Sequence, residues 1–256
     1  MYFNDVFIGY YVLVAFIGLI VGKFVAWCNI RLPENKKVFS KDFFEANKQG
    51  LKANYIFMIL IAMLYVSLLY RFGINRNNIE TNLDLLKFFI LTPMIVLAFS
   101  IDYSHRIIPN RLNLTIFEIG LIITFIYGIS NVNMAKDYIL GMFTGIAIFI
   151  IITLLGRIIS GKEAMGLGDV KFMGALGLYF GISTIAEISL LAFFIAAIGS
   201  VFILIFRFLI LKKKDEYIPF GPFLSIAAIV CIFLPSSMVF NTFLDFCRMI
   251  SDKILM

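Results

Sequence analysis

Two aspartates differ from the other acidic residues of this sequence because each lies at the end of a long apolar segment. Most of the 16 acidic residues lie in polar loops, whereas Asp102 closes the segment LAFSID and Asp169 begins the segment DVKFMGALG. An acidic side chain beside a membrane span is costly, so its presence indicates a function. Two carboxylates held close together cannot both ionise cheaply, so one serves as an acid while the other serves as a base. This division suits peptide hydrolysis by water, and the pair would titrate as one unit.

The composition predicts that membrane helices carry these aspartates. Of the 256 residues 61% are hydrophobic, and the mean hydropathy is +0.97, an excess that one soluble core cannot bury. Because several apolar runs reach the length needed to cross a bilayer, we predict an all-α polytopic membrane protein with about eight transmembrane helices. The predicted spans are residues 6–30, 54–71, 87–102, 111–129, 138–158, 170–182, 184–210 and 219–240.

The basic residues predict the orientation of the spans. Of the 22 Lys and Arg residues, 15 fall in loops on one side, six fall on the other, and Lys23 lies within the first span. The positive-inside rule places the richer side in the cytoplasm and both termini outside. Two spans separate Asp102 from Asp169, so both are predicted at the cytoplasmic face. Lys212–Lys214 are explained by topology, or alternatively by acidic lipid headgroups.

The glycines before Asp169 suit the approach of an extended peptide. Gly166 and Gly168 carry no side chain and permit unusual φ values, so a substrate backbone could come close to the carboxylate. Lys171 is explained more simply as a topology charge than as a catalytic cation. The sixth span is short and rich in glycine, so it is expected either to be tilted or to be buried among other helices, where small residues permit close packing: Gly174, Gly177 and Gly181.

Other polar residues have simpler explanations beside the functional ones. A lone aspartate at the end of a span is commonly a cap, and His105 is typical of a polar loop. Lys23 either extends to the interface or pairs with a buried acid, for which Glu118 and Glu187 are candidates.

Four stretches together resemble the type IV prepilin peptidases, a bacterial family of G-x-G-D aspartyl proteases. They stand in the family's order along the chain: Gly18–Gly22 leading to Asn29–Pro33 (NIRLP), Asp102 followed by Ile108 and Pro109, Gly166–Asp169 followed by Val170 and Lys171, and Ile218–Phe223 (IPFGPF).

The resemblance implies an endopeptidase in the bacterial cytoplasmic membrane that removes the leader from type IV prepilins or pseudopilins, with its active site facing the cytoplasm. Asp102 and Asp169 would be the catalytic pair, supported by Gly166, Gly168 and Lys171. Residues 85–256 would form the membrane-embedded peptidase domain. Residues 1–84 would form an N-terminal membrane region with a short cytoplasmic loop, a candidate for a residual methyltransferase region. The product would serve a type IV pilus, a type II secretion system or a competence apparatus.

A substrate cleft is expected beside the catalytic pair. Its candidate residues are Ile108, Pro109, Pro219, Gly221 and Pro222. A basic leader would prefer acidic contacts, for which the cytoplasmic candidates are Glu34, Asp42, Glu45, Glu163, Asp215 and Glu216.

Many longer members of this family also methylate the new N-terminus and carry four cysteines in the first cytoplasmic loop. That loop contains no cysteine here, and Cys28 precedes it. Methylation with S-adenosylmethionine as cofactor therefore stays open, whereas the peptidase chemistry needs no cofactor.

Several other classes of function receive less support. With one histidine and no C-x-x-C pair, a structural metal site is not expected. The positive charge lies in short loops, which argues against nucleic acid as a partner and for membrane lipids. The main alternative is an ion- or proton-coupled transporter that uses the same aspartates; a non-catalytic assembly component and a presenilin-like protease are further alternatives.

Overall fold

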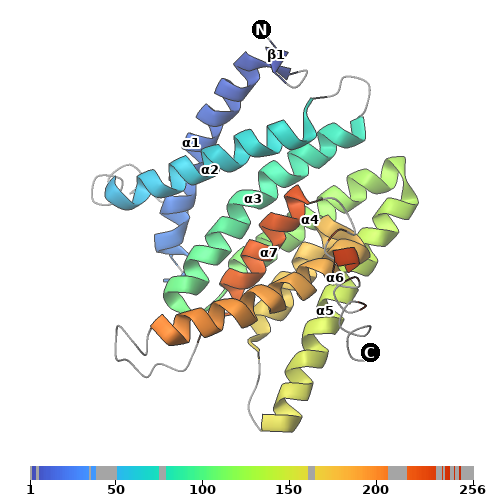
Figure 1. The fold of residues 1–256 in the computed structure, drawn as a ribbon. Coiled ribbons are helices and arrows are strands. Elements are labelled where there is room, and N and C mark those ends of the chain that lie inside the picture. The colour runs from blue at the N-terminus through green and yellow to red at the C-terminus, as the bar shows by residue number, and fades with distance from the viewer. Residues whose placement is uncertain are drawn as a thin grey trace. The chain divides into compact units, whose positions relative to one another are not determined.

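The computed structural model is nearly all helical (Figure 1). It describes residues 2–3, 6–34, 36–38, 51–74, 79–160, 165–206 and 218–234, together with residues 238, 240–242, 245 and 248. Two short antiparallel strands place Tyr2 opposite Phe7 and Phe3 opposite Val6. The elements in chain order are β1 (Tyr2–Phe3), β2 (Val6–Phe7), α1 (Ile8–Arg31), α2 (Leu51–Phe72), α3 (Ile79–His105), α4 (Asn110–Ser130), α5 (Val132–Ser160), α6 (Leu167–Phe206) and α7 (Gly221–Phe233).

The helices identify a multi-pass membrane protein. Six helices within the described residues are long and apolar enough to cross a bilayer, namely α1 to α6, and α7 is a shorter apolar helix. Exposed side chains along them are predominantly large and apolar, as lipid contact requires. The predicted all-α polytopic class is therefore confirmed.

Helix α6 contains a break that accounts for two of the predicted spans. Gly181 has φ 75° and ψ −179°, so the helix is interrupted between the predicted spans 170–182 and 184–210. Met173 before the break and Ile185 after it both lie beside Gly145 of α5: a side chain added at Gly145 would lie 2.6 Å from the Met173 carbonyl oxygen and 3.3 Å from Ile185. The chain therefore reverses its direction at the break. Figure 1 shows the two segments of α6 running in different directions.

The chain divides into two compact units, Met1–Leu112 and Asn113–Met256. In the first unit α1 packs closely on α2, because a side chain at Gly18 would meet the Ala62 backbone at 2.6 Å. Helix α3 joins this pair through the Tyr65 hydroxyl, which donates to the Phe89 carbonyl oxygen at 2.7 Å. The predicted boundary between the N-terminal membrane region and the peptidase domain, at residues 84 and 85, differs from this structural boundary at residues 112 and 113. The functional boundary stays a prediction.

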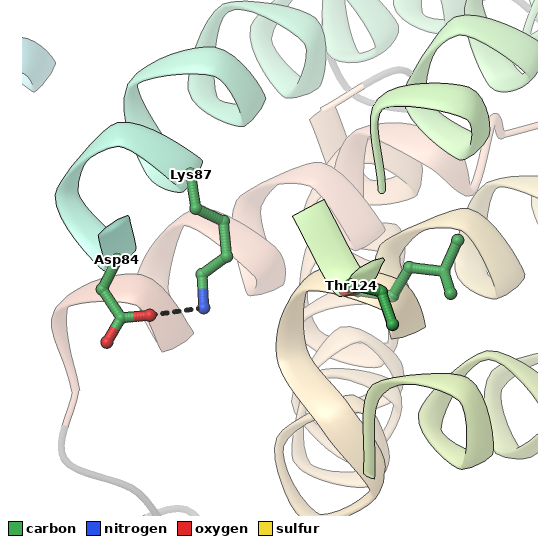
Figure 2. A network of polar contacts seen from close by, with 4 residues as sticks. Asp84, Lys87 and Thr124 are labelled. Atoms are coloured by element: carbon green, nitrogen blue, oxygen red, sulfur yellow. Dashed lines mark hydrogen bonds and ion pairs between the residues drawn. The ribbon is translucent and has the colours of Figure 1, made fainter. Parts of the chain in front are cut away.

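Lys87 is buried in α3, although its charge alone predicted a place on the outer side. Its side chain is 5% exposed and forms an ion pair with Asp84 at 2.7 Å, one helical turn earlier (Figure 2). The ammonium group also lies 4.7 Å from the centre of the Phe88 ring. The helix begins at Ile79, eight residues before the predicted start of the span, so the pair belongs to its first turns.

In the second unit, α5 and the first segment of α6 pack backbone to backbone. A side chain at Gly177 would collide with the backbone of Gly141 and Met142, and one at Gly174 would lie 2.5 Å from Ile146. Small residues allow this approach in a membrane, where apolar side chains gain little by leaving lipid. The close packing predicted from Gly174 and Gly177 is therefore confirmed.

Candidate active site

Asp102 lies in the last turn of α3 and is buried, with 5% of its surface exposed. Its backbone carbonyl accepts a hydrogen bond from the Arg106 amide at 2.8 Å, which closes the end of the helix. A carboxyl group in such a site is stable only when neutral or supplied with polar partners. The structure thus provides a buried carboxyl group at a helix end, where the sequence predicted it.

The turn after Asp102 is short and directs the chain into α4. Arg106 adopts φ 59°, a left-handed conformation that non-glycine residues seldom take outside turns and functional sites. The Pro109 carbonyl then accepts a hydrogen bond from the Leu112 amide at 3.0 Å, as α4 begins. Ile108 and Pro109, predicted to line a cleft, are both buried.

Asp169 lies in the first turn of α6 and is 9% exposed. Its amide donates to the Gly166 carbonyl at 3.0 Å, so the G-x-G-D segment forms a tight turn into the helix. The N-terminal end of a helix carries partial positive charge and favours a carboxylate there. Lys171, two residues further on, is exposed.

Gly166 leaves space beside the Asp169 carboxyl group. A side-chain carbon added at Gly166 would lie 3.6 Å from Asp169 Oδ2, an ordinary van der Waals contact. Positive φ occurs among the described glycines at Gly73 and Gly181, so Gly166 does not use the left-handed φ values that glycine permits. The absence of a side chain, rather than special backbone freedom, is therefore what Gly166 contributes.

Asn113 holds the G-x-G-D turn from α4, and sequence reasoning missed this residue. Its Nδ2 donates to the Gly168 carbonyl oxygen at 3.0 Å, and its side chain is buried. A buried amide within the apolar segment LNLTIF was the available signal. Residues 113 and 168 are far apart in sequence, so no local pattern predicted their contact.

The I-P-F-G-P-F segment is anchored by an aromatic cluster at the start of α7. The Phe220 ring centre lies 6.2 Å from that of Phe149 in α5 and 5.3 Å from that of Phe193 in α6. Gly221 and Pro222 are buried in the first turn of α7, and Pro219 is partly exposed.

This cluster lies at the same level as Asp169 along the helix pair. Gly145 of α5 faces Met173 of α6, and the two segments run antiparallel because Gly141 faces Gly177. Phe149 lies one turn after Gly145 in α5, and Asp169 lies one turn before Met173 in α6. Because the two segments run antiparallel, both residues lie about 6 Å from the Gly145–Met173 contact in the same direction along the pair. Phe149 therefore marks the level of Asp169 along the pair.

The remaining predicted residues fall in different environments. Lys23 and Glu118 are exposed, whereas Glu187 is 5% exposed in the second segment of α6. His105 is exposed at the end of α3 and acts electrostatically on Glu34.

Several predicted residues lie outside the described part of the chain. They include the lysines of the cluster Lys212–Lys214 and five of the acids proposed for leader binding: Asp42, Glu45, Glu163, Asp215 and Glu216. Asp102 belongs to the first unit and Asp169 to the second.

Residues 89–234 match the sequence profile of the type IV leader peptidase family. This match covers more than half of the chain and includes Asp102, the G-x-G-D turn and the segment that begins α7. The chain belongs to the type IV leader peptidase family.

Individual relatives support the family assignment. A prepilin leader peptidase/N-methyltransferase of Xanthomonas campestris is 30% identical over 71% of this chain and 58% of its own length. A protein of the same name from Haemophilus influenzae is 26% identical over 79% of this chain and 80% of its own. The leader peptidase HopD of Escherichia coli is 32% identical over 53% of this chain and 84% of its own.

The chain spans only part of several longer relatives. It covers 58% of the Xanthomonas protein and 47% of a related protein from Aeromonas hydrophila. No solved structure gave a significant match.

Proposed function

We propose that this chain is a membrane-embedded aspartyl endopeptidase that removes the leader from type IV prepilins or pseudopilins. The observation that carries the proposal is the placement of two buried carboxyl groups, Asp102 and Asp169, each in the terminal turn of a membrane helix. Both lie within the part of the chain that matches the leader peptidase family. Three relatives whose names describe leader peptidases lend further support.

The proposed chemistry uses one proton shared by the two carboxyl groups. The ionised carboxylate takes a proton from a water molecule, whose oxygen attacks the scissile carbonyl carbon. The protonated carboxyl group donates to the carbonyl oxygen, and a proton then passes to the leaving amine as the C–N bond breaks. The two groups exchange roles during the cycle, so neither aspartate has a fixed role. The open space beside Gly166 would admit the substrate backbone to the Asp169 carboxyl group.

The proposed site faces the cytoplasm. Two helices, α4 and α5, separate Asp102 from Asp169 in the chain, and each is long enough to span the membrane. If both cross, the two aspartates return to the same face, and the excess of Lys and Arg in the connecting loops marks that face as cytoplasmic. The membrane would be the bacterial cytoplasmic membrane, and the processed subunits would serve a pilus, secretion or competence machine.

Methylation of the new N-terminus is a separate proposal. Two of the relatives carry N-methyltransferase in their names, whereas HopD is named only as a leader peptidase. The methyl donor would be S-adenosylmethionine. The first cytoplasmic loop lacks cysteine, so methylation here would have to proceed without the cysteine tetrad of many longer family members.

The decisive experiment is leader removal from a prepilin of the same organism by the full chain in detergent, followed by mass spectrometry. Asp102→Asn and Asp169→Asn keep the size of each side chain but remove its ability to act as an acid or base, so neither variant should cleave. Glu118→Gln, an exposed acid in α4, is the matched control and should retain activity.

Two outcomes of this experiment would be informative beyond cleavage itself. Addition of S-adenosylmethionine with a gain of one methyl group on the product would establish methylation. If the wild type leaves the prepilin intact, or the asparagine variants cleave at its rate, the aspartyl mechanism is wrong, and proton-coupled transport becomes the function to test.

A further inference from the structure

Side-chain hydrogen bonds connect α4 to the first segment of α6. Asn113 Nδ2 donates to the Gly168 carbonyl at 3.0 Å, and Thr124 Oγ1 donates to the Leu178 carbonyl at 3.2 Å. The Tyr179 hydroxyl donates in the opposite direction, to the Ile116 carbonyl at 2.8 Å. Gly120 allows the close approach, since a side chain there would lie 2.9 Å from Leu178. Of these bonds, the one from Asn113 reaches the G-x-G-D turn.

The orientation of the Asn113 side chain is fixed by its partner. A carbonyl oxygen can only accept a hydrogen bond, so the NH₂ group of the amide must face Gly168 and the amide oxygen must face away. The side chain is 4% exposed, and Oδ1 has no hydrogen-bond partner among the described residues.

An asparagine of this kind is a poor choice for stability alone. Leaving a buried acceptor without a partner generally costs more free energy than one neutral hydrogen bond contributes. Burying an apolar side chain of similar size would avoid this cost. The amide at this position is better explained by the orientation that it gives to the turn.

We propose that Asn113 is a positioning residue of the peptidase: by fixing the Gly168 carbonyl, it sets the direction of the peptide plane that leads directly into Asp169. The Asp169 amide is itself held by the Gly166 carbonyl at 3.0 Å, so the two bonds together fix both ends of the Gly168–Asp169 peptide. The carboxyl group is then held where the reaction requires it, instead of moving with a loose turn. A misplacement of about 1 Å in such a group lowers the rate about 100-fold.

The test compares Asn113→Leu and Asn113→Ala with wild type in the full chain. Leucine removes the donor with little change in volume, and alanine removes the donor with a smaller side chain. We expect kcat for prepilin cleavage to fall about 10- to 100-fold with KM unchanged, because the turn and not the substrate contact is altered. Thr124→Val is the matched control, since it removes the same kind of α4–α6 bond far from Asp169 and should retain kcat.

A second measurement does not depend on the substrate. Hydrogen exchange of the segment Gly166–Val170 should accelerate in both Asn113 variants and stay at the wild-type rate in Thr124→Val. The inference rests on the proposed peptidase function only for its kinetic part. If wild type does not cleave, that function fails, and hydrogen exchange still decides whether Asn113 orders the turn.

Three results would overturn the positioning role. They are wild-type kcat in both Asn113 variants, an equal loss in Thr124→Val, and unchanged exchange of the turn. A loss that only follows the fraction of folded protein in all three variants would indicate a structural role instead.

Discussion

The carboxylate of Asp137 accepts a hydrogen bond from the backbone amide of Ile182, with Oδ1 and N 3.3 Å apart. Ile182 is the first residue after the break at Gly181, so a side chain from the start of α5 caps the second segment of α6. The four amides at the start of a helix lack partners within it, and an acidic side chain satisfies one of them. The reversal inside α6 is therefore stabilised by a contact from another helix.

Gly181→Ala is expected to destabilise the second unit strongly. Gly181 has φ 75° and ψ −179°, a conformation almost restricted to glycine, and an added side chain would collide with the Asp137 carboxylate. The backbone strain alone costs about 1–3 kcal/mol. Thermal unfolding in detergent measures the effect. Gly73→Ala is the control: φ is 66° there, but the nearest atom is 4.0 Å away, so only the strain applies. Equal losses at both positions would argue against the collision.

Asp137→Ala should lower stability by about 1 kcal/mol through loss of the cap, while Asp137→Asn should retain part of it because its oxygen still accepts. The same unfolding assay applies. Asn131 caps α5 itself by accepting from Asn133 at 3.0 Å, so Asn131→Ala provides a comparison of similar size within one region. An unchanged melting temperature for Asp137→Ala would show that the contact to Ile182 contributes nothing.

Gly177→Ala should separate α5 from α6. The added methyl group would collide with the backbone of Gly141, which cannot move aside as a flexible side chain could. Overpacking of this kind costs about 1–3 kcal/mol. The unfolding midpoint should fall, and leader cleavage should fall with it because α6 carries Asp169. Gly128→Ala, with only the Ala135 side chain at 3.2 Å, should be milder.

Gly166→Ala should reduce cleavage without reducing stability. The methyl group fits at 3.6 Å from Asp169 Oδ2, so the fold tolerates it, but it fills the space through which a substrate backbone would reach the carboxyl group. We expect a lower kcat/KM with an unchanged melting temperature. If the alanine variant cleaves at the wild-type rate, the open space is not used by the substrate.

Glu34→Gln should change the KM for a basic leader little. The Lys36 ammonium, hydrogen-bonded to Glu34, lowers the pKa of this carboxyl group, with smaller contributions from His105 and Arg31. A lowered pKa keeps Glu34 ionised at neutral pH, and its pairing is lost only as the pH falls through the lowered pKa in acid. Because its charge is already paired, Glu34 offers weak attraction to a leader. A large rise in KM on substitution would restore it as a leader contact.

The sequence by itself determined the class of protein and the approximate positions of its long helices. These features can be predicted from short stretches of sequence, because they reflect the contact of each segment with the bilayer and with residues close by in the chain. They are the apolar runs, the Lys and Arg residues of the loops and the glycines of the sixth span. The spans 170–182 and 184–210 flank the observed break at Gly181, and the predicted aspartates lie in the terminal turns of α3 and α6.

The tertiary structure decided which distant residues support one another. Asn113 and Gly168 are 55 residues apart, and Asp137 and Ile182 are 45 apart, so no local periodicity encodes either hydrogen bond. The charge of Lys87 predicted a place outside the membrane spans, but α3 begins at Ile79 and buries this lysine beside Asp84. In each case a polar group inside an apolar environment needs a partner, and packing, rather than sequence spacing, selects which residue supplies it.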